Sequence, residues 1–451
     1  MDALTYRDGE LYVEQARLTD VAARHGTPAI VYSSEIITSN CDRMLKAFSP
    51  VDAALRVAIK SVGNAGVLRA AVKHGAGLCA IGGFELERAW LTGCDMFDVV
   101  LAGLGKTDED LRAALDGLYS PLFAAGAVVR ERPATYRGPV GLLVAESAQE
   151  LERIERIADG LRINCRVLLR VNSDEAASAE SKFGVSPEAA LELLSHDRNS
   201  RAAVVGLHTH VGPSIHDLGR MQIAVEGLVE LFERLDSQAA ARGSQRFDTI
   251  DIGGGFAAIG LSKRVPTPEE YAAVLCPSLT NLARRGVRVL LEPGRAVFGS
   301  SAVLVTTVID VKKGEDRAFA VCDAGINEKT RPAQTEGFRM AWPVVVPKGM
   351  EPPQSGDDRL DTEGLEWTDI VGPGGLDNDA IARGRLCPPV KPGDLIAVFG
   401  AGAYTREALT TSDERCTPAE LLVEQYNVRQ TRPRRTMLDA LGPEADAAKG
   451  W

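Results

Sequence analysis

The sequence predicts an α/β protein in which a parallel (β/α)8 barrel is followed by a mostly β domain. The chain has 451 residues, which is too long for one ordinary small domain and fits two domains with a sizeable core. From about residue 29 to residue 293, short apolar runs alternate with amphipathic helical stretches. After residue 294 strand-like runs continue without long helices, which favours a second, mostly β domain.

The longer, first part of the chain supplies the predicted barrel elements. A strand-like run at residues 10–13 and a helix-like run at residues 18–25 come first. The apolar runs that predict barrel strands are residues 29–32, 55–59, 99–102, 166–171, 204–208, 249–252 and 287–291. Helical stretches such as residues 148–158 and 221–239 fall between them. This alternation predicts parallel strands joined by helices, with a doubly wound sheet as the alternative to a closed barrel.

The last part of the chain reads as strands and loops. The runs that predict strands are residues 301–311, 318–322, 342–346 and 394–398. Residues 348–369 are polar and acidic with several turn formers, so we expect an exposed loop there. From about residue 429 we expect either a frayed helix or disorder.

Composition and charge exclude several function classes. The formal net charge of −11 argues against nucleic acid or an anionic membrane as the main partner. No apolar run approaches the ~20 residues of a membrane span, and the first residues lack the pattern of a signal peptide, so we expect a cytoplasmic protein. The 8 cysteines have no CxxC spacing, which favours reduced thiols over disulfides or structural zinc.

In a parallel barrel, chemistry gathers where strands end, and two strand ends here carry basic groups. Lys60 ends an apolar run, where burial lowers the pKa of an amine and allows it to attack a carbonyl; the alternative is an edge lysine with a solvated tip. His208 and His210 stand at alternate positions, so both can point into the barrel mouth. They can also be core histidines or metal ligands, but no carboxylate stands at ligand spacing beside them, and we predict no metal site.

Two further strand ends carry features that suit an anion. The three glycines of residues 253–255 follow the strand that ends near Asp251, and their N–H groups can close on a phosphate, although tight turns also use such glycines. Glu292 and Arg295 follow an apolar strand, where charges are costly unless something in the pocket pairs with them.

One cofactor uses all four features together. Pyridoxal phosphate has an aldehyde for a lysine, a phosphate for glycine amides and an arginine, a ring face for a histidine and a ring nitrogen for a carboxylate. The carboxylate keeps the nitrogen protonated, so that the ring remains an electron sink. The four strand ends together therefore predict a pyridoxal phosphate site.

Several motifs in this chain resemble those of one family: Asp8-Gly9-Glu10-Leu11, Gly26-Thr27-Pro28, Glu85-Leu86-Glu87-Arg88-Ala89, Ser181-Lys182-Phe183-Gly184-Val185, Cys322-Asp323-Ala324-Gly325-Ile326-Asn327, Arg331-Pro332-Ala333 and Gly402-Ala403-Tyr404. Through them the chain, from about Leu4 to Leu422, resembles the fold-type III pyridoxal-phosphate decarboxylases, which include diaminopimelate, ornithine and arginine decarboxylases. The diaminopimelate branch is the one that it resembles most.

This resemblance implies a domain plan of the alanine racemase type. It implies a pyridoxal-phosphate-binding (β/α)8 barrel at residues 29–296 and a β domain at residues 297–428. Residues 1–28 are expected to join the β domain, and residues 429–451 form a tail. The expected partners are an amino-acid substrate and a second copy of the chain, in a homodimer with shared active sites.

The resemblance also implies roles for single residues. Lys60 binds the cofactor aldehyde, His210 lies on the ring face, and Glu292 pairs with the ring nitrogen. The residues expected at the phosphate or at the substrate are Gly254, Gly255, Gly294, Arg295, Arg331 and Tyr404. The implied reaction is loss of carbon dioxide from a substrate whose amine has replaced the amine of Lys60 on the cofactor.

Departures from the family pattern bear on the substrate. Gly375 and Leu376 stand where the family has a catalytic cysteine and an acidic residue, and a leucine there cannot pair with the distal ammonium of diaminopimelate. We therefore expect a decarboxylase for a different amino acid or a carboxylate-bearing conjugate, of the kind found in siderophore or other specialised biosynthesis. Asp377 and Asp379 either contact an amine or lie in a solvated loop.

Other departures leave the phosphate contacts and the proton donor open. Thr335 replaces a family tyrosine, and Pro213 replaces a phosphate-binding serine for which Ser214 can substitute. The reaction proton can come from Lys60, His210, water or another cysteine such as Cys387.

Two rival functions remain at this point. A racemase or epimerase would invert its substrate without releasing carbon dioxide, and it would need a second base opposite Lys60. A relative that acts only by binding a protein would show no cofactor absorption band.

Overall fold

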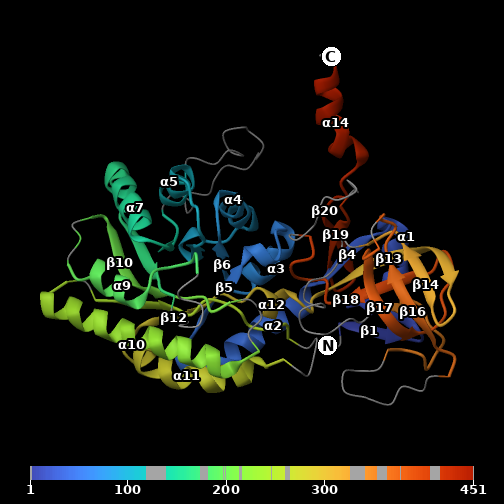
Figure 1. The fold of residues 1–451 in the computed structure, drawn as a ribbon, viewed down its shortest axis with the longest axis horizontal. Helices are drawn as coiled ribbons and strands as arrows, with labels where there is room; N and C mark the ends of the chain where they lie inside the picture. Colours follow the sequence, from blue (N-terminus) through green and yellow to red (C-terminus); the bar gives the residue numbers. More distant parts are fainter. Residues whose placement is uncertain are drawn as a thin grey trace. The chain divides into compact units, whose positions relative to one another are not determined.

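The chain folds into two compact units. The computed structural model describes residues 3–117, 139–172, 181–196, 198, 200–212, 216–244, 246–259, 265–325, 341–352, 363–375, 377–406 and 417–449. The barrel unit comprises residues 41–257 and 266–294, and the β unit comprises residues 1–40, 258–265 and 295–451 (Figure 1).

The barrel unit is built on eight parallel strands. They close in the order β10-β11-β12-β5-β6-β7-β8-β9, which confirms the predicted barrel. The strands are β5 (Ala54–Ala58), β6 (Gly77–Ala80), β7 (Val99–Leu101), β8 (Leu142–Ala145), β9 (Cys165–Arg170), β10 (Ala202–His208), β11 (Thr249–Asp251) and β12 (Arg288–Leu291). Because all eight run in one direction, their carboxyl ends meet at one mouth of the barrel.

Helices follow the strands in sequence and surround the barrel. They are α2 (Ser34–Ala47), which spans the boundary between the units, α3 (Ala65–Lys73), α4 (Gly83–Thr92), α5 (Asp108–Asp116), α7 (Ala148–Leu161), α9 (Pro187–Leu193), α10 (Leu218–Arg242) and α11 (Pro268–Arg284). Short 3-10 turns lie at Ser49–Val51, Ile59–Ser61 and Met96–Asp98. Helices α10 and α11 lie side by side (Figure 1). Side-chain caps, such as Asn64 on α3 and the Thr267/Glu270 capping box on α11, set where the helices begin.

The barrel interior is apolar away from its mouth. A cluster of buried side chains from successive strands, including Val100, Val144, Leu168 and Leu290, fills it. The buried ionisable groups of the candidate site, His208, Asp251 and Glu292, lie at the carboxyl ends of their strands.

The β unit is a mixed sheet with a small N-terminal sheet. The N-terminal sheet contains β1 (Leu4–Arg7), β2 (Glu10–Val13) and β3 (Ala16–Arg17), followed by α1 (Leu18–His25). The mixed sheet contains β4 (Ala29–Ser33), β13 (Ala302–Lys313), β14 (Ala318–Cys322), β15 (Ala341–Pro343), β16 (Glu366–Val371), β17 (Ala380–Cys387), β18 (Leu395–Phe399), β19 (Ala419–Glu424) and β20 (Asn427–Arg432). Helices α12 (Arg295–Phe298) and α14 (Met437–Ala448) complete it. A second β domain after the barrel is thus confirmed.

Two sequence-based expectations are corrected here. Residues 29–32 are not the first barrel strand, because β4 pairs antiparallel with β13 and parallel with β19 in the mixed sheet. All five β4 residues are buried, and a fully buried apolar run looks alike in a barrel and in a covered sheet. The expected frayed tail also begins later, since residues 427–432 form strand β20 and Met437–Ala448 forms helix α14.

Among the described residues, the structure contains no helix with both the length and the apolar character that a membrane crossing requires.

Candidate active site

A cavity of about 490 Å³ lies at the mouth of the barrel unit. Its wall includes six side chains from five strand regions: Lys60, Cys79, Arg170, His208, His210 and Glu292. The structure thus brings three of the predicted site residues, Lys60, His210 and Glu292, into one pocket. Arg170 and Cys79 are additions that sequence reasoning did not find.

Lys60 is held on a rigid turn. Strand β5 ends at Ala58, and the hydroxyl of Ser61 donates a hydrogen bond to the Ala58 carbonyl at 2.6 Å. The N–H of Val62 donates to the carbonyl of Ile59 at 2.9 Å, which closes a single 3-10 turn around Lys60. Asn64 then caps helix α3 through the N–H of Gly66 at 2.9 Å. This sequence of turn and cap fixes the backbone from which the lysine reaches the cavity.

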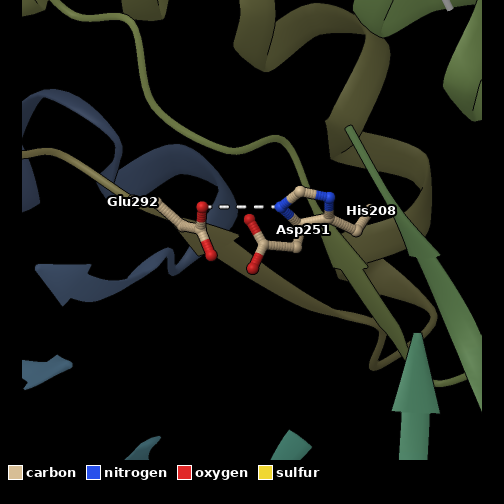
Figure 2. Close-up of side chains that lie close together, drawn as sticks. All are labelled: His208, Asp251 and Glu292. Atoms are coloured by element: carbon tan, nitrogen blue, oxygen red, sulfur yellow. Dashed lines mark hydrogen bonds and ion pairs between the residues drawn. The ribbon is translucent and has the colours of Figure 1, made fainter. Parts of the chain in front are cut away.

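Three ionisable side chains form a buried cluster at the base of this cavity. One nitrogen or oxygen of each of His208, Asp251 and Glu292 lies within 4.8 Å of the others. Figure 2 shows His208 directed at Glu292, with Nε2 of the imidazole 3.4 Å from Oε2 of the carboxylate. Oδ1 of Asp251 accepts a hydrogen bond from the N–H of Gly253 at 2.8 Å. The three residues come from β10, β11 and β12 or their ends, which are neighbours in the barrel.

The two carboxyl groups of the cluster differ in their affinity for a proton. Burial, together with the charge of Glu292, raises the pKa of Asp251. Burial acts in the same direction on Glu292, but the positive charge and hydrogen bond of His208 and the nearby thiol of Cys79 outweigh it, so the pKa of Glu292 is lowered. Glu292 is therefore the carboxyl of the pair that stays ionised.

The hydrogen bonding of this cluster indicates which group can bind here. Within the described part of the chain, Oε1 of Glu292 is buried and accepts no hydrogen bond. The cluster is also a donor set for a divalent cation, which sequence spacing missed because its members lie on different strands. However, His208 and Glu292 contact one another directly, and Asp251 already binds Gly253. A buried carboxylate oxygen left over at a pocket wall fits a protonated ring nitrogen, as in pyridoxal phosphate.

His210 is held neutral. Burial and the positive charge of Lys60 lower the pKa of His210 to about 3. The N–H of Gly254 donates a hydrogen bond to Nδ1 of His210 at 3.1 Å, so the ring proton lies on Nε2. A neutral imidazole with a fixed orientation suits packing against a flat ring.

The glycine turn packs tightly against the end of β12. Gly253 and Gly255 have positive φ angles of 69° and 96°, which favour glycine. A Cβ atom on Gly254 would lie 2.4 Å from the carbonyl oxygen of Glu292 and 3.3 Å from Cε1 of His210. The turn therefore sets the positions of both neighbours.

Gly254→Ala is expected to weaken pyridoxal phosphate binding by at least tenfold, because the added methyl group displaces Glu292, His210 or both by a fraction of an ångström. Titration of cofactor-free protein with pyridoxal phosphate measures this. Gly227→Ala is the matched control: it lies inside α10 with open space around its Cβ position, so it is expected to bind the cofactor normally. Equal binding by both variants would contradict a role for the turn.

Other predicted site residues lie in the β unit or at the unit boundary. Gly294 is buried in the turn after β12. Arg295 is buried at the start of α12, and its guanidinium carbon lies 5.0 Å from the ring centroid of Tyr404. Tyr404 has a φ of 55°, a rare backbone conformation for a tyrosine. The two residues predicted for phosphate or substrate thus stack on one another.

The loop that departs from the family pattern lies partly outside the described residues. Gly375 is exposed, and among the described residues that are not its chain neighbours none has an atom within 4 Å of its Cβ position. Asp377 is exposed, whereas Asp379 is buried and accepts a hydrogen bond from the N–H of Gly374 at 2.5 Å, so it braces its own loop. The predicted residues that lie outside the described part of the chain are Pro213, Ser214, Arg331, Thr335 and Leu376.

Cys387, a candidate proton donor, is a buried residue at the end of β17, and burial raises the pKa of its thiol to about 11.

Arg170 and Glu146 lie at the barrel mouth, although they were not predicted as site residues. Each stands at or directly after the end of an apolar strand, which is the signal that identified Lys60 and Glu292.

Comparisons with known proteins identify the family of this chain. The family model described as "Pyridoxal-dependent decarboxylase, pyridoxal binding domain" matches residues 34–299. Diaminopimelate decarboxylase of Aquifex aeolicus is 30% identical over 98% of this chain and 97% of its own length, and that of Pseudomonas fluorescens is 31% identical over 99% of each.

Solved structures give the same result. A crystal structure from Aquifex aeolicus, 30% identical, covers 99% of this chain and 98% of its own, with a TM-score of 0.80. Diaminopimelate decarboxylase from M. jannaschii in complex with L-lysine shares the fold, with a TM-score of 0.81, 22% identity and 98% coverage of both chains. The chain therefore belongs to the family of pyridoxal-dependent decarboxylases.

Proposed function

We propose that the cavity at the barrel mouth is the site where this decarboxylase binds pyridoxal phosphate and an amino-acid substrate. The observation that carries the proposal is the buried Oε1 of Glu292, which has no hydrogen-bond partner among the described residues and lies in the same cavity as Lys60 and a neutral His210. When bound, the cofactor supplies an electron sink that takes up the electron pair left by departing carbon dioxide.

The protein's own residues hold and tune that group. Lys60 would bind the cofactor aldehyde through Nζ and would release it to the amine of the substrate. Glu292, kept ionised by His208, holds a proton on the ring nitrogen. Neutral His210 packs on the ring face, with its orientation set by Gly254. The proposed phosphate residues are Gly254, Gly255, Gly294, Arg295 and Tyr404. The proposed substrate residues are Arg295, Arg331, Asp377 and Tyr404.

We propose further that the substrate is an amino acid or a carboxylate-bearing conjugate other than meso-diaminopimelate. Support comes from Gly375 and Leu376, which offer neither a thiol nor a carboxylate where the family has both. Leaving a distal ammonium without a partner costs roughly 1–3 kcal/mol, or about 5- to 150-fold in kcat/KM. The relatives named above are diaminopimelate decarboxylases, so that substrate is the necessary comparison.

Carbon dioxide release from a panel of amino acids and carboxylated conjugates tests both proposals. One panel member is expected to exceed meso-diaminopimelate by at least about tenfold in kcat/KM. If meso-diaminopimelate is the best substrate, the substrate proposal fails and the site proposal stands. Inversion of a substrate without gas release would instead indicate a racemase.

We also propose that the chain acts as a homodimer, as the family resemblance implies. A dimer mass in light scattering of the purified protein would support this. Full decarboxylase activity in a monomer would contradict it.

A further inference from the structure

Four charged side chains lie buried at one wall of the cavity, with Arg170 in the wall and the other three behind it, and the proposed function uses none of them. The side chains of Lys106, Glu150, Glu146 and Arg170 are 0%, 7%, 2% and 10% exposed. Two positive and two negative groups are thus removed from water together, at a desolvation cost that only well-formed contacts offset. Their contacts lead step by step to the cavity.

Glu146 makes the contacts nearest the cavity, one with each carboxylate oxygen. Oε1 accepts a hydrogen bond from Nη1 of Arg170 at 2.7 Å, and Oε2 accepts one from the backbone N–H of Gly184 at 2.9 Å. Both partners adjoin residues that line the cavity, and Arg170 lines it itself. A single carboxylate therefore ties the end of β9 to the segment Ser181–Gly184.

Glu146 is held in turn from behind. Its own N–H donates to Oε2 of Glu150 at 2.8 Å, and the same oxygen lies 3.1 Å from Nζ of Lys106. Nζ of Lys106 also donates to the carbonyl of Gly103, another cavity residue, at 2.5 Å. Glu146 is thereby held twice, through its backbone N–H and through its side-chain carboxylate.

Arg170 connects these buried charged groups to the cavity. Its guanidinium carbon lies 4.5 Å from the ring centroid of Phe183, so the aromatic ring packs against one face of the guanidinium group. The charge of Arg170 acts on His210, the imidazole proposed to lie on the cofactor ring. Backbone pairing of Val185 with Arg170, at 3.0 Å, keeps the Phe183 segment beside the strand end.

We propose that Glu146 is a positioning residue that holds Arg170 and Phe183 in the cavity wall, and that Arg170 binds an anionic oxygen of the cofactor or the substrate. This inference rests on the proposed function of the cavity. A planar guanidinium needs such a fixed orientation to bind an oxygen with directed hydrogen bonds.

Four variants test the inference: Glu146→Gln, Arg170→Met, the double variant and the control Glu152→Gln, an exposed glutamate of α7. Glu146→Gln and Arg170→Met are each expected to lose about 10- to 100-fold in kcat/KM, and Glu152→Gln is expected to lose none. Because Glu146 acts through Arg170, the double variant should fall within about twofold of Arg170→Met.

Cofactor binding distinguishes the two sources of the oxygen. If it belongs to the cofactor, both single variants show a raised dissociation constant for pyridoxal phosphate and a shifted pH midpoint of its absorption band. If it belongs to the substrate, KM rises and both cofactor readouts stay as in the wild type. Either pattern supports the inference.

The inference is overturned if Glu146→Gln matches Glu152→Gln in every readout, or if the losses of Glu146→Gln and Arg170→Met simply multiply. If Glu146→Gln does not fold, Glu146→Asp takes its place in the double-variant comparison, because aspartate keeps the charge but has a shorter side chain. If the losses of Glu146→Asp and Arg170→Met then simply multiply, the inference is overturned. Failure of the wild type to bind pyridoxal phosphate would be a separate result, directed at the proposed function.

Discussion

Lys60→Ala is expected to lose the near-visible absorption band of the bound cofactor and to reduce decarboxylation by roughly 10⁴-fold or more. The amine of Lys60 is the group proposed to bind the cofactor aldehyde, and alanine offers no nucleophile in its place. The turn that carries Lys60 is held by backbone and Ser61 contacts, so the fold should survive the change. Absorption spectroscopy and carbon dioxide release measure the two effects.

Lys46→Ala is the matched control, because Lys46 is an exposed lysine in the last turn of α2. It should keep both the band and the activity. A Lys60→Ala protein that retained the band would place the covalent attachment elsewhere and remove the centre of the proposed site.

Glu292→Gln is expected to keep the cofactor but to reduce decarboxylation by about 10²- to 10³-fold, a loss typical of removing one key electrostatic contact. Glutamine matches glutamate in shape but carries no charge, so it cannot keep the ring nitrogen protonated. The buried His208 would also lose its charged partner. Steady-state kinetics beside a cofactor titration separates this loss of kcat from a loss of binding.

Glu188→Gln, at an exposed position in the first turn of α9, serves as the comparison. Wild-type kcat is expected for it. If Glu292→Gln were equally active, the pairing of Glu292 with the ring nitrogen would be excluded.

Strand ends made much of the site predictable. Lys60 and Glu292 each follow a largely apolar strand, and in a parallel barrel all such positions face one mouth. His208, Asp251 and Glu292 are far apart in sequence, yet their strands β10, β11 and β12 are neighbours. Their meeting therefore follows from the fold class and strand order, although residue spacing alone does not show it.

The residues that escaped prediction did so for physical reasons. Cys79 lies within an apolar strand, where a thiol behaves as one more small apolar side chain. Arg170 lies within the strand-like run itself, so it was taken as a strand residue although its side chain reaches the cavity. Strand β4 was misplaced because burial on both faces is common to barrels and covered sheets.

In the mixed sheet of the β unit, strand β4 from near the start of the chain pairs with strand β19 from near its end. The order of synthesis therefore limits the order in which this sheet can form. Ala29 of β4 pairs with Ala419 of β19, 390 residues further along. At about 5–20 residues per second, a ribosome reaches β19 roughly 20–80 s after β4 emerges. Strand β4 must wait through the whole synthesis of the barrel as an unpaired apolar edge, which is exposed to aggregation. The barrel can fold first from contiguous sequence; β13 is the first partner of β4 to be synthesised, and β19 can pair with β4 only afterwards.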